Sequence, residues 1–214
     1  YPKPAVYDRK GWHPMPYLNQ GEFYSEFASF KVSITLPENY VLAASGNMDA
    51  NPEEEQRILD NIRQTDEYLQ KGFPAKDTFP PSSAKLKTVT YRLDSVHDFA
   101  WFADKRYHIM VGEAQLDGSG KTIDTYAYFC NKNAKEWSKA VEYTADALKH
   151  YSKLVGDYPY AVCKVVDGAL SAGAGMEYPS ITIIAYPGTA EALDRVIAHE
   201  VGHLSNGDAR LNIH

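Results

Sequence analysis

The sequence has few cysteines and no long hydrophobic run. Cys130 and Cys163 are the only two cysteines among 214 residues, so at most one disulfide can form within the chain. The two thiols can instead remain free and buried, and their number does not decide the redox compartment. No apolar stretch approaches the roughly 18 residues of a membrane-spanning helix, since the run at 181–185 is only as long as a strand. We therefore expect no membrane span.

An excess of basic residues is also missing. Lys and Arg number 22 against 28 Asp and Glu, which gives a formal charge of -6 and a pI near 5.6. The phosphates of nucleic acids and anionic lipids repel such a protein unless a basic patch offsets its charge, and no run of Lys and Arg is present. We expect neither nucleic acid nor an anionic membrane as the main partner.

The chain has no initiator methionine and no signal-peptide pattern. It starts with Tyr1-Pro2-Lys3-Pro4, and we interpret this start as processed or excised. Localisation therefore stays open between an exported bacterial protein and a cytoplasmic one. The composition also leaves the oligomeric state undecided.

The sequence does contain the pattern His-Glu-x-x-His, at residues 199–203. Two histidines four positions apart lie on one face of a helix, so both imidazoles can reach one metal ion. The pattern predicts one zinc ion bound by His199 and His203, with Glu200 as the catalytic base that takes a proton from water. A short pattern also permits a structural interpretation, in which the two histidines are merely solvated or packed in the core.

The surroundings of this pattern favour a buried helix. Thr189 can cap the helix, and Glu191 suits its positively polarised first turn. Apolar residues then lie on more than one side of the helix, as expected for a helix enclosed by its neighbours; these are Leu193, Val196, Ile197, Val201 and Leu204.

Periodic patterns elsewhere predict both strands and helices. Strands are expected at 31–36, 40–44, 86–93, 107–111, 122–129, 160–166 and 180–185, and helices at 51–71, 134–155 and 189–207. The first part is rich in strands, and its one helix starts at Asn51 with a solvated acidic run. The second part alternates strands with helices. This order predicts an α+β fold in which helices pack on a mixed sheet.

A second segment of chemical interest is Gly175-Met176-Glu177-Tyr178, which follows a Gly-rich turn. Small residues let a peptide backbone approach closely, and an exposed strand edge can pair with an extended substrate. A carboxylate at Glu177 could then pair with the ammonium terminus of a peptide. A purely structural turn before a strand is the alternative. The spacing differs from that of phosphate-binding loops, which disfavours nucleotide binding.

Taken together, the two segments resemble the zinc aminopeptidases of the aminopeptidase N family, which are gluzincins. These enzymes carry a Gly-x-Met-Glu-Asn motif on an edge strand and a His-Glu-x-x-His helix in a thermolysin-like domain. Here Ala174 stands at the first Gly and Tyr178 at the Asn, as in a bacterial Gly-Gly-Met-Glu-Tyr-Pro variant. The resemblance implies that Glu177, Gly175 and Met176 bind the substrate. It also implies hydrolysis of the N-terminal peptide bond by zinc-activated water, on peptides with a free N-terminus.

The resemblance covers most of the chain. Residues 21–46 resemble the closing strands of the family's N-terminal β domain, and residues 96–104 resemble its junction with the catalytic domain. These similarities imply a β-rich N-terminal portion at 1–94 and the first half of a thermolysin-like zinc peptidase domain at 95–214.

The end of the chain departs from the family. Family members have a third zinc ligand, a Glu, and a transition-state Tyr downstream of the His-Glu-x-x-His helix. This chain ends 11 residues after His203, before either position is reached. We therefore expect the chain to be truncated after the helix and to be an inactive or incomplete fragment of the enzyme.

Two alternatives stay open. Asp208 or His214 could supply a non-family third ligand and make a zinc endopeptidase, although Gly207 is one position out of register with the metzincin pattern. The other alternative is a non-catalytic module that binds peptides along the strand at 176–184. Glu200 argues against that module, because peptide binding alone has no need of a carboxylate there.

Overall fold

The structure is a computed structural model that describes residues 5–14, 25–170, 175–185 and 188–210, without the side chains of 206–210. Its strands are β1 (Val6–Asp8), β2 (Gly11–His13), β3 (Ala28–Pro37), β4 (Val41–Ala44), β5 (Asn47–Met48), β6 (Leu86–Val96), β7 (Trp101–Asp104), β8 (His108–Gln115), β9 (Thr122–Phe129), β10 (Val162–Gly168), β11 (Gly175–Tyr178) and β12 (Ile181–Ala185). Its helices are α1 (Pro52–Lys71), η1 (Asn131–Asn133), α2 (Ala134–Trp137), α3 (Ala140–Val155) and α4 (Ala190–Arg210).

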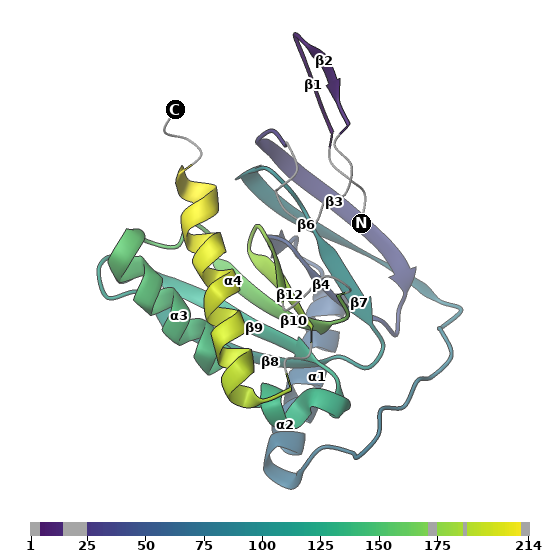
Figure 1. Cartoon of the computed structure of the whole chain (residues 1–214). Coiled ribbons are helices and arrows are strands. Elements are labelled where there is room, and N and C mark those ends of the chain that lie inside the picture. Colours follow the sequence, from purple (N-terminus) through teal and green to yellow (C-terminus); the bar gives the residue numbers. More distant parts are fainter. Residues whose placement is uncertain (1–4, 15–24, 171–174, 186–187, 211–214) are drawn as a thin grey trace.

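A mixed five-stranded sheet forms the centre of the molecule, with strand order β11-β12-β10-β9-β8 (Figure 1). Strand β10 is parallel to both of its neighbours, whereas β8 and β11 are antiparallel edge strands. Helices α3 and α4 pack together on one face, and α1 packs against β8 on the other. The predicted α+β class, with helices on a mixed sheet, is confirmed.

Strands β1 and β2 pair antiparallel in a separate hairpin, and the other strands form a smaller β unit beside the central sheet. It consists of a three-stranded sheet, β3-β6-β5, and the pair β4-β7. The two strands predicted at 31–36 and 40–44 are present, but each pairs with a strand much later in the chain. The predicted division between residues 94 and 95 falls inside β6, and the domain assignment stays a prediction.

The helix predicted at 134–155 is interrupted, which corrects its expected length. A 3₁₀ turn and the short α2 precede α3, because tertiary contacts hold this corner in place. The Asn133 side chain donates to both carboxylate oxygens of Asp167 at 2.9 Å, and the Trp137 ring is fully buried against Phe129. The break itself lies at Ser138 and Lys139, between α2 and α3.

The core lies on both faces of the central sheet. The face under α3 and α4 buries Leu193, Ile197, Val201 and Leu204 of α4, and each such side chain contributes about 1.5–3 kcal/mol when fully buried. Both cysteines are free and buried. No helix in the described parts of the chain is long and apolar enough to cross a membrane.

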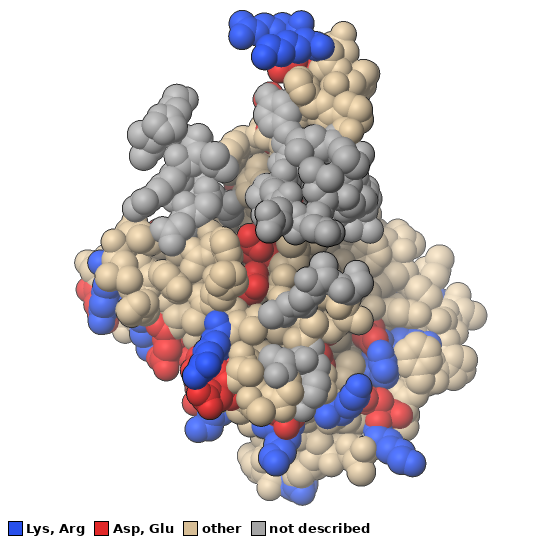
Figure 2. Space-filling view, in the orientation of Figure 1, with Lys and Arg blue, Asp and Glu red and all other residues tan. Residues whose placement is uncertain are grey.

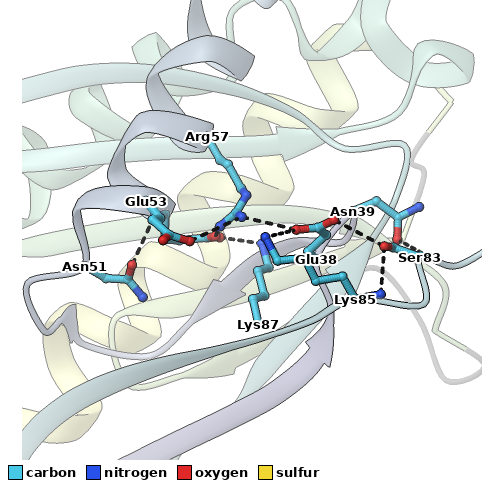
Figure 3. Close-up of polar contacts among 9 residues, drawn as sticks. Glu38, Asn39, Asn51, Glu53, Arg57, Ser83, Lys85 and Lys87 are labelled. Carbon is cyan, nitrogen blue, oxygen red and sulfur yellow. Dashed lines mark hydrogen bonds and ion pairs between the residues drawn. The ribbon is translucent and has the colours of Figure 1, made fainter.

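Helix α1 starts as predicted, since Asn51 Oδ1 accepts the backbone N–H of Glu54 at 3.1 Å. The expectation of a solvated acidic run is wrong for Glu54, which is buried. Its carboxylate pairs with Lys87 of β6 at 2.6 Å, where the two side chains are 4% and 7% exposed. Burial lowers the pKa of Lys87, whereas the hydrogen bond and charge of Glu54 oppose that shift. Arg57 of α1 forms ion pairs with both Glu54 and Glu38, and Figure 3 shows Arg57, Glu38 and Lys87 within this network.

This ion pair ties α1 to the small β unit, so breaking it should destabilise the fold. We expect Lys87→Met to lower the free energy of unfolding by about 3 kcal/mol, because it leaves a buried carboxylate short of its main partner. The exposed pair Lys71–Glu67, with side chains 71% and 67% exposed, offers the matched control. Lys71→Met should leave urea unfolding almost unchanged. Equal effects of the two substitutions would contradict a stabilising role for burial of the pair.

Candidate active site

Helix α4 presents its two pattern histidines outward because its other side is anchored in the core. Thr189 Oγ1 accepts the backbone N–H of Ala192 at 3.1 Å and so caps the helix as predicted. The buried apolar residues of α4 lie on the opposite side from His199 and His203, which are both exposed. The helix also lies close to α3 at Gly202, where an added Cβ would be 2.8 Å from the Tyr151 hydroxyl.

The two imidazoles are arranged as a pair of metal ligands would be. His199 Nε2 and His203 Nε2 are 3.1 Å apart. Two nitrogens bound tetrahedrally to one zinc ion at about 2.0–2.1 Å would be separated by about 3.3 Å, so the observed separation fits zinc with little movement. Among the described residues, no group of three or more His, Cys, Asp or Glu could hold a metal ion. The residues present therefore fit zinc as two ligands of an incomplete set.

Strand β11 lies opposite this pair and brings Glu177 to it. In the antiparallel pairing with β12, Gly175 is opposite Ile184 and Glu177 is opposite Thr182. Because side chains alternate along a strand, Glu177 and the bare face of Gly175 point toward α4. Glu177 Oε1 is 3.5 Å from His203 Nδ1, and its side chain is 22% exposed. That distance suits an ion pair and is too long for a good hydrogen bond.

Met176 points the other way. It pairs with Ile183 and packs into the apolar cluster on the far face of the sheet. Its side chain therefore does not reach the corner where Glu177 lies. A role of Met176 toward a peptide would have to use its backbone, whose carbonyl already accepts the Thr182 hydroxyl at 2.9 Å.

Glu200 is buried between α4 and β11. It is 3% exposed, and a Cβ built on Gly175 would lie 2.3 Å from its Oε1. Its Oε2 has no hydrogen-bond partner in the described part of the chain. Burial raises the pKa of Glu200 to about 8, and Glu177 acts in the same direction through its charge and a hydrogen bond. A buried carboxylate with an unused acceptor is poised to bind a polar ligand.

The structure thus brings five of the six predicted site residues to one corner and turns the side chain of the sixth away. Tyr151 of α3 packs beside α4 at Gly202, and its place in a helical apolar stripe is typical of core packing. The side chain of Asp208 and all of His214 lie outside the described residues, as do 171–174 of the Gly-rich turn. On the face of the molecule seen in Figure 2, Lys and Arg are interspersed with Asp and Glu, apart from a basic group at the tip of the β1–β2 hairpin.

Solved structures of zinc peptidases share this fold. The M1 zinc metallopeptidase from Deinococcus radiodurans matches with a TM-score of 0.54 and 19% sequence identity, over 84% of this chain and 34% of that one. A variant of a two-domain M1 zinc metallopeptidase bound to L-arginine gives a TM-score of 0.55 with the same identity and coverage. Aminopeptidase A from Legionella pneumophila in complex with aspartic acid gives 0.56 at 18% identity, over 83% of this chain and 19% of that one.

At this level of identity the likeness establishes the fold. The chain spans no more than 34% of the length of these structures. No protein-family model matches the sequence, and no curated protein matches it.

The close contact between Gly175 and Glu200 leads to a prediction. Gly175→Ala would place a methyl group within 2.3–2.8 Å of the Glu200 side chain, so the flexible carboxylate must move. We expect a crystal structure of the variant to show a displaced Glu200, with a melting temperature close to that of the wild type. Gly118→Ala is the matched control, because nothing lies within 4 Å of an added Cβ there. An unmoved Glu200 would contradict the contact.

Proposed function

We propose that the chain is part of a zinc-dependent aminopeptidase that hydrolyses the N-terminal peptide bond of peptides. The observation that carries the proposal is the pair of imidazole nitrogens 3.1 Å apart, next to the buried Glu200 and facing Glu177 on the edge strand. The fold shared with an M1 zinc metallopeptidase and with an aminopeptidase A supports this assignment. The histidines alone would fit several metalloenzymes, whereas the carboxylate on the facing strand suits a substrate with a free amine.

His199 and His203 would hold one zinc ion through their Nε2 atoms. When bound, zinc polarises a carbonyl and makes water more acidic. Glu200 lies one residue from the first ligand, and its carboxylate would accept the proton of the attacking water and later deliver it to the leaving amine. Its burial keeps competing solvent away from that carboxylate.

Strand β11 would hold the peptide. As an edge strand of the sheet it has paired with β12 on one side, and its other edge offers backbone groups to an extended substrate. The partly exposed Glu177 would pair with the α-ammonium group and so restrict cleavage to the first peptide bond. Gly175 would allow the peptide backbone to approach closely, and Met176 would contribute through its backbone.

The third zinc ligand and a transition-state stabiliser are needed to complete the site, and we place both outside the described residues. A catalytic zinc ion normally has three protein ligands, and two histidines bind the metal weakly. The described residues by themselves then form an incomplete catalytic site. Activity tests therefore belong in a protein that carries this chain together with a complete set of ligands.

The assignment as an aminopeptidase predicts how Glu177→Ala behaves in that complete protein. The ratio of kcat/KM for a free aminoacyl-arylamide to that for its N-acetylated form should fall at least 10-fold, about 1.4 kcal/mol of lost discrimination. Zinc content should fall much less. Glu113→Ala, at an exposed position of the edge strand β8, is the control and should change neither quantity. Cleavage of the acetylated substrate by the wild type would refute the aminopeptidase assignment.

The role of Glu200 as base leads to a separate prediction. Glu200→Gln keeps the size of the side chain but cannot accept the proton, so we expect kcat to drop by about 100-fold or more with zinc content unchanged. His203→Ala should instead lose zinc, and His150→Ala, on the exposed side of α3, should retain it. Turnover that survives in Glu200→Gln would remove Glu200 as base, and a zinc-free wild type would favour a peptide-binding module.

A further inference from the structure

The turn between β11 and β12 has an unusual backbone. Tyr178 pairs with Ile181, so only Pro179 and Ser180 connect the strands. Ser180 has a φ of +64° and is fully buried. A proline followed by a residue with positive φ is the pattern of a type II turn, in which the second residue is normally Gly or Asn. Serine at this position must be held by contacts that glycine would not make.

The Ser180 side chain reaches the small β unit. Its Oγ accepts the backbone N–H of Gly46 at 2.7 Å, in a hydrogen bond that is buried. Gly46 itself has a φ of +75°, and an added Cβ would lie 2.1 Å from the carbonyl oxygen of Arg92. Gly46, just after β4, thus lies between β6 and the β11–β12 turn, and its backbone N–H donates to that turn.

Lys164 of β10 closes the connection from a third side. Its side chain is buried, and its Nζ donates to the carbonyl oxygens of Ala44 at 2.5 Å and of Gly46 at 2.6 Å. Its backbone N–H donates to the Ser180 carbonyl at 3.0 Å. The same lysine therefore holds both the turn and the residue that the turn binds. Its ammonium group also lies 5.0 Å from the centroid of the Tyr91 ring.

We propose that Lys164, Ser180 and Gly46 form a clamp that positions strand β11, and with it Glu177, for the amine of the peptide. As an edge strand, β11 pairs only with β12 among the described strands of the sheet. The turn therefore fixes it to the small β unit through buried hydrogen bonds, beside the ring contact between Tyr178 and Phe102 of β7. Glu177 is three residues before Ser180 in the chain. The clamp consists of positioning residues, and its role toward the peptide rests on the proposed aminopeptidase function.

The first test measures amide hydrogen exchange in β11 of the 214-residue chain. Ser180→Ala removes the hydroxyl that accepts from Gly46, and Lys164→Met removes the ammonium donor while keeping a long side chain. Each should accelerate exchange of the β11 amides by about 3- to 10-fold, as the loss of one buried hydrogen bond predicts. If Lys164→Met fails to fold, Ser180→Gly takes its place, because it removes the hydroxyl together with the strain of a positive φ.

Two matched controls come from hydrogen bonds that do not involve the turn. Ser45 Oγ accepts the Ala100 N–H at 3.1 Å in the same junction, and Lys121 Nζ donates to the Tyr158 carbonyl at 2.7 Å. Ser45→Ala and Lys121→Met should leave β11 exchange unchanged. Unchanged exchange in Ser180→Ala, or equal acceleration in both controls, would overturn the clamp.

The second test uses the complete protein with free and N-acetylated aminoacyl-arylamides. Ser180→Ala should raise KM for the free substrate several-fold, with kcat and zinc content nearly unchanged, because the amine anchor is displaced while the base and metal ligands on α4 are not. A fall in kcat alone, or a loss of zinc, would overturn the positioning role. A wild type without preference for the free amine would refute the proposed function, and the exchange measurement would still decide whether the clamp exists.

Discussion

Helix α4 can lie close to strand β11 because Gly175 has no side chain. A Cβ there would lie 2.3 Å from the Glu200 carboxylate, so any other residue would push the two elements or the carboxylate apart. The opposite side of α4 is held by four apolar residues in the core. Helix α4 is therefore fixed by its core side, and its other side contacts β11 where Glu200 packs on Gly175. The histidine pair, the buried Glu200 and Glu177 all come together through this approach.

Two buried glutamate side chains, Glu54 and Glu200, have different surroundings. Glu54 and Lys87 are both buried, but they pair at 2.6 Å and join α1 to the small β unit. Glu200 is equally buried, yet its Oε2 is unpaired among the described residues and the nearby carboxylate of Glu177 is unfavourable. An unsatisfied buried acceptor costs about 1–3 kcal/mol, and packing elsewhere must offset this cost. This unpaired buried acceptor supports the catalytic role that we propose for Glu200.

The small β unit acts as a support for the central sheet. The backbone N–H of Gly46 donates to the Ser180 hydroxyl, and the backbone carbonyl of Gly46 accepts from the Lys164 ammonium group. A serine with positive φ costs of order 1–3 kcal/mol, and the buried hydrogen bond to Gly46 compensates part of that. The two units are thereby joined through specific polar contacts as well as apolar packing. Strand β11 receives its position from this junction.

Local pattern in the sequence is enough to predict the α+β class and the capped helix with its two histidines, because periodicity and spacing depend on residues close together in the chain. The place of Glu177 on an edge strand was implied by the family resemblance. Only the tertiary structure decided that Glu200 packs on Gly175, that Met176 faces away, that α2 and α3 are separate, and that Glu54 is buried. It also placed Ser180 against Gly46, 134 positions away in the chain. Contacts of this kind depend on how distant elements pack, and no local pattern encodes them.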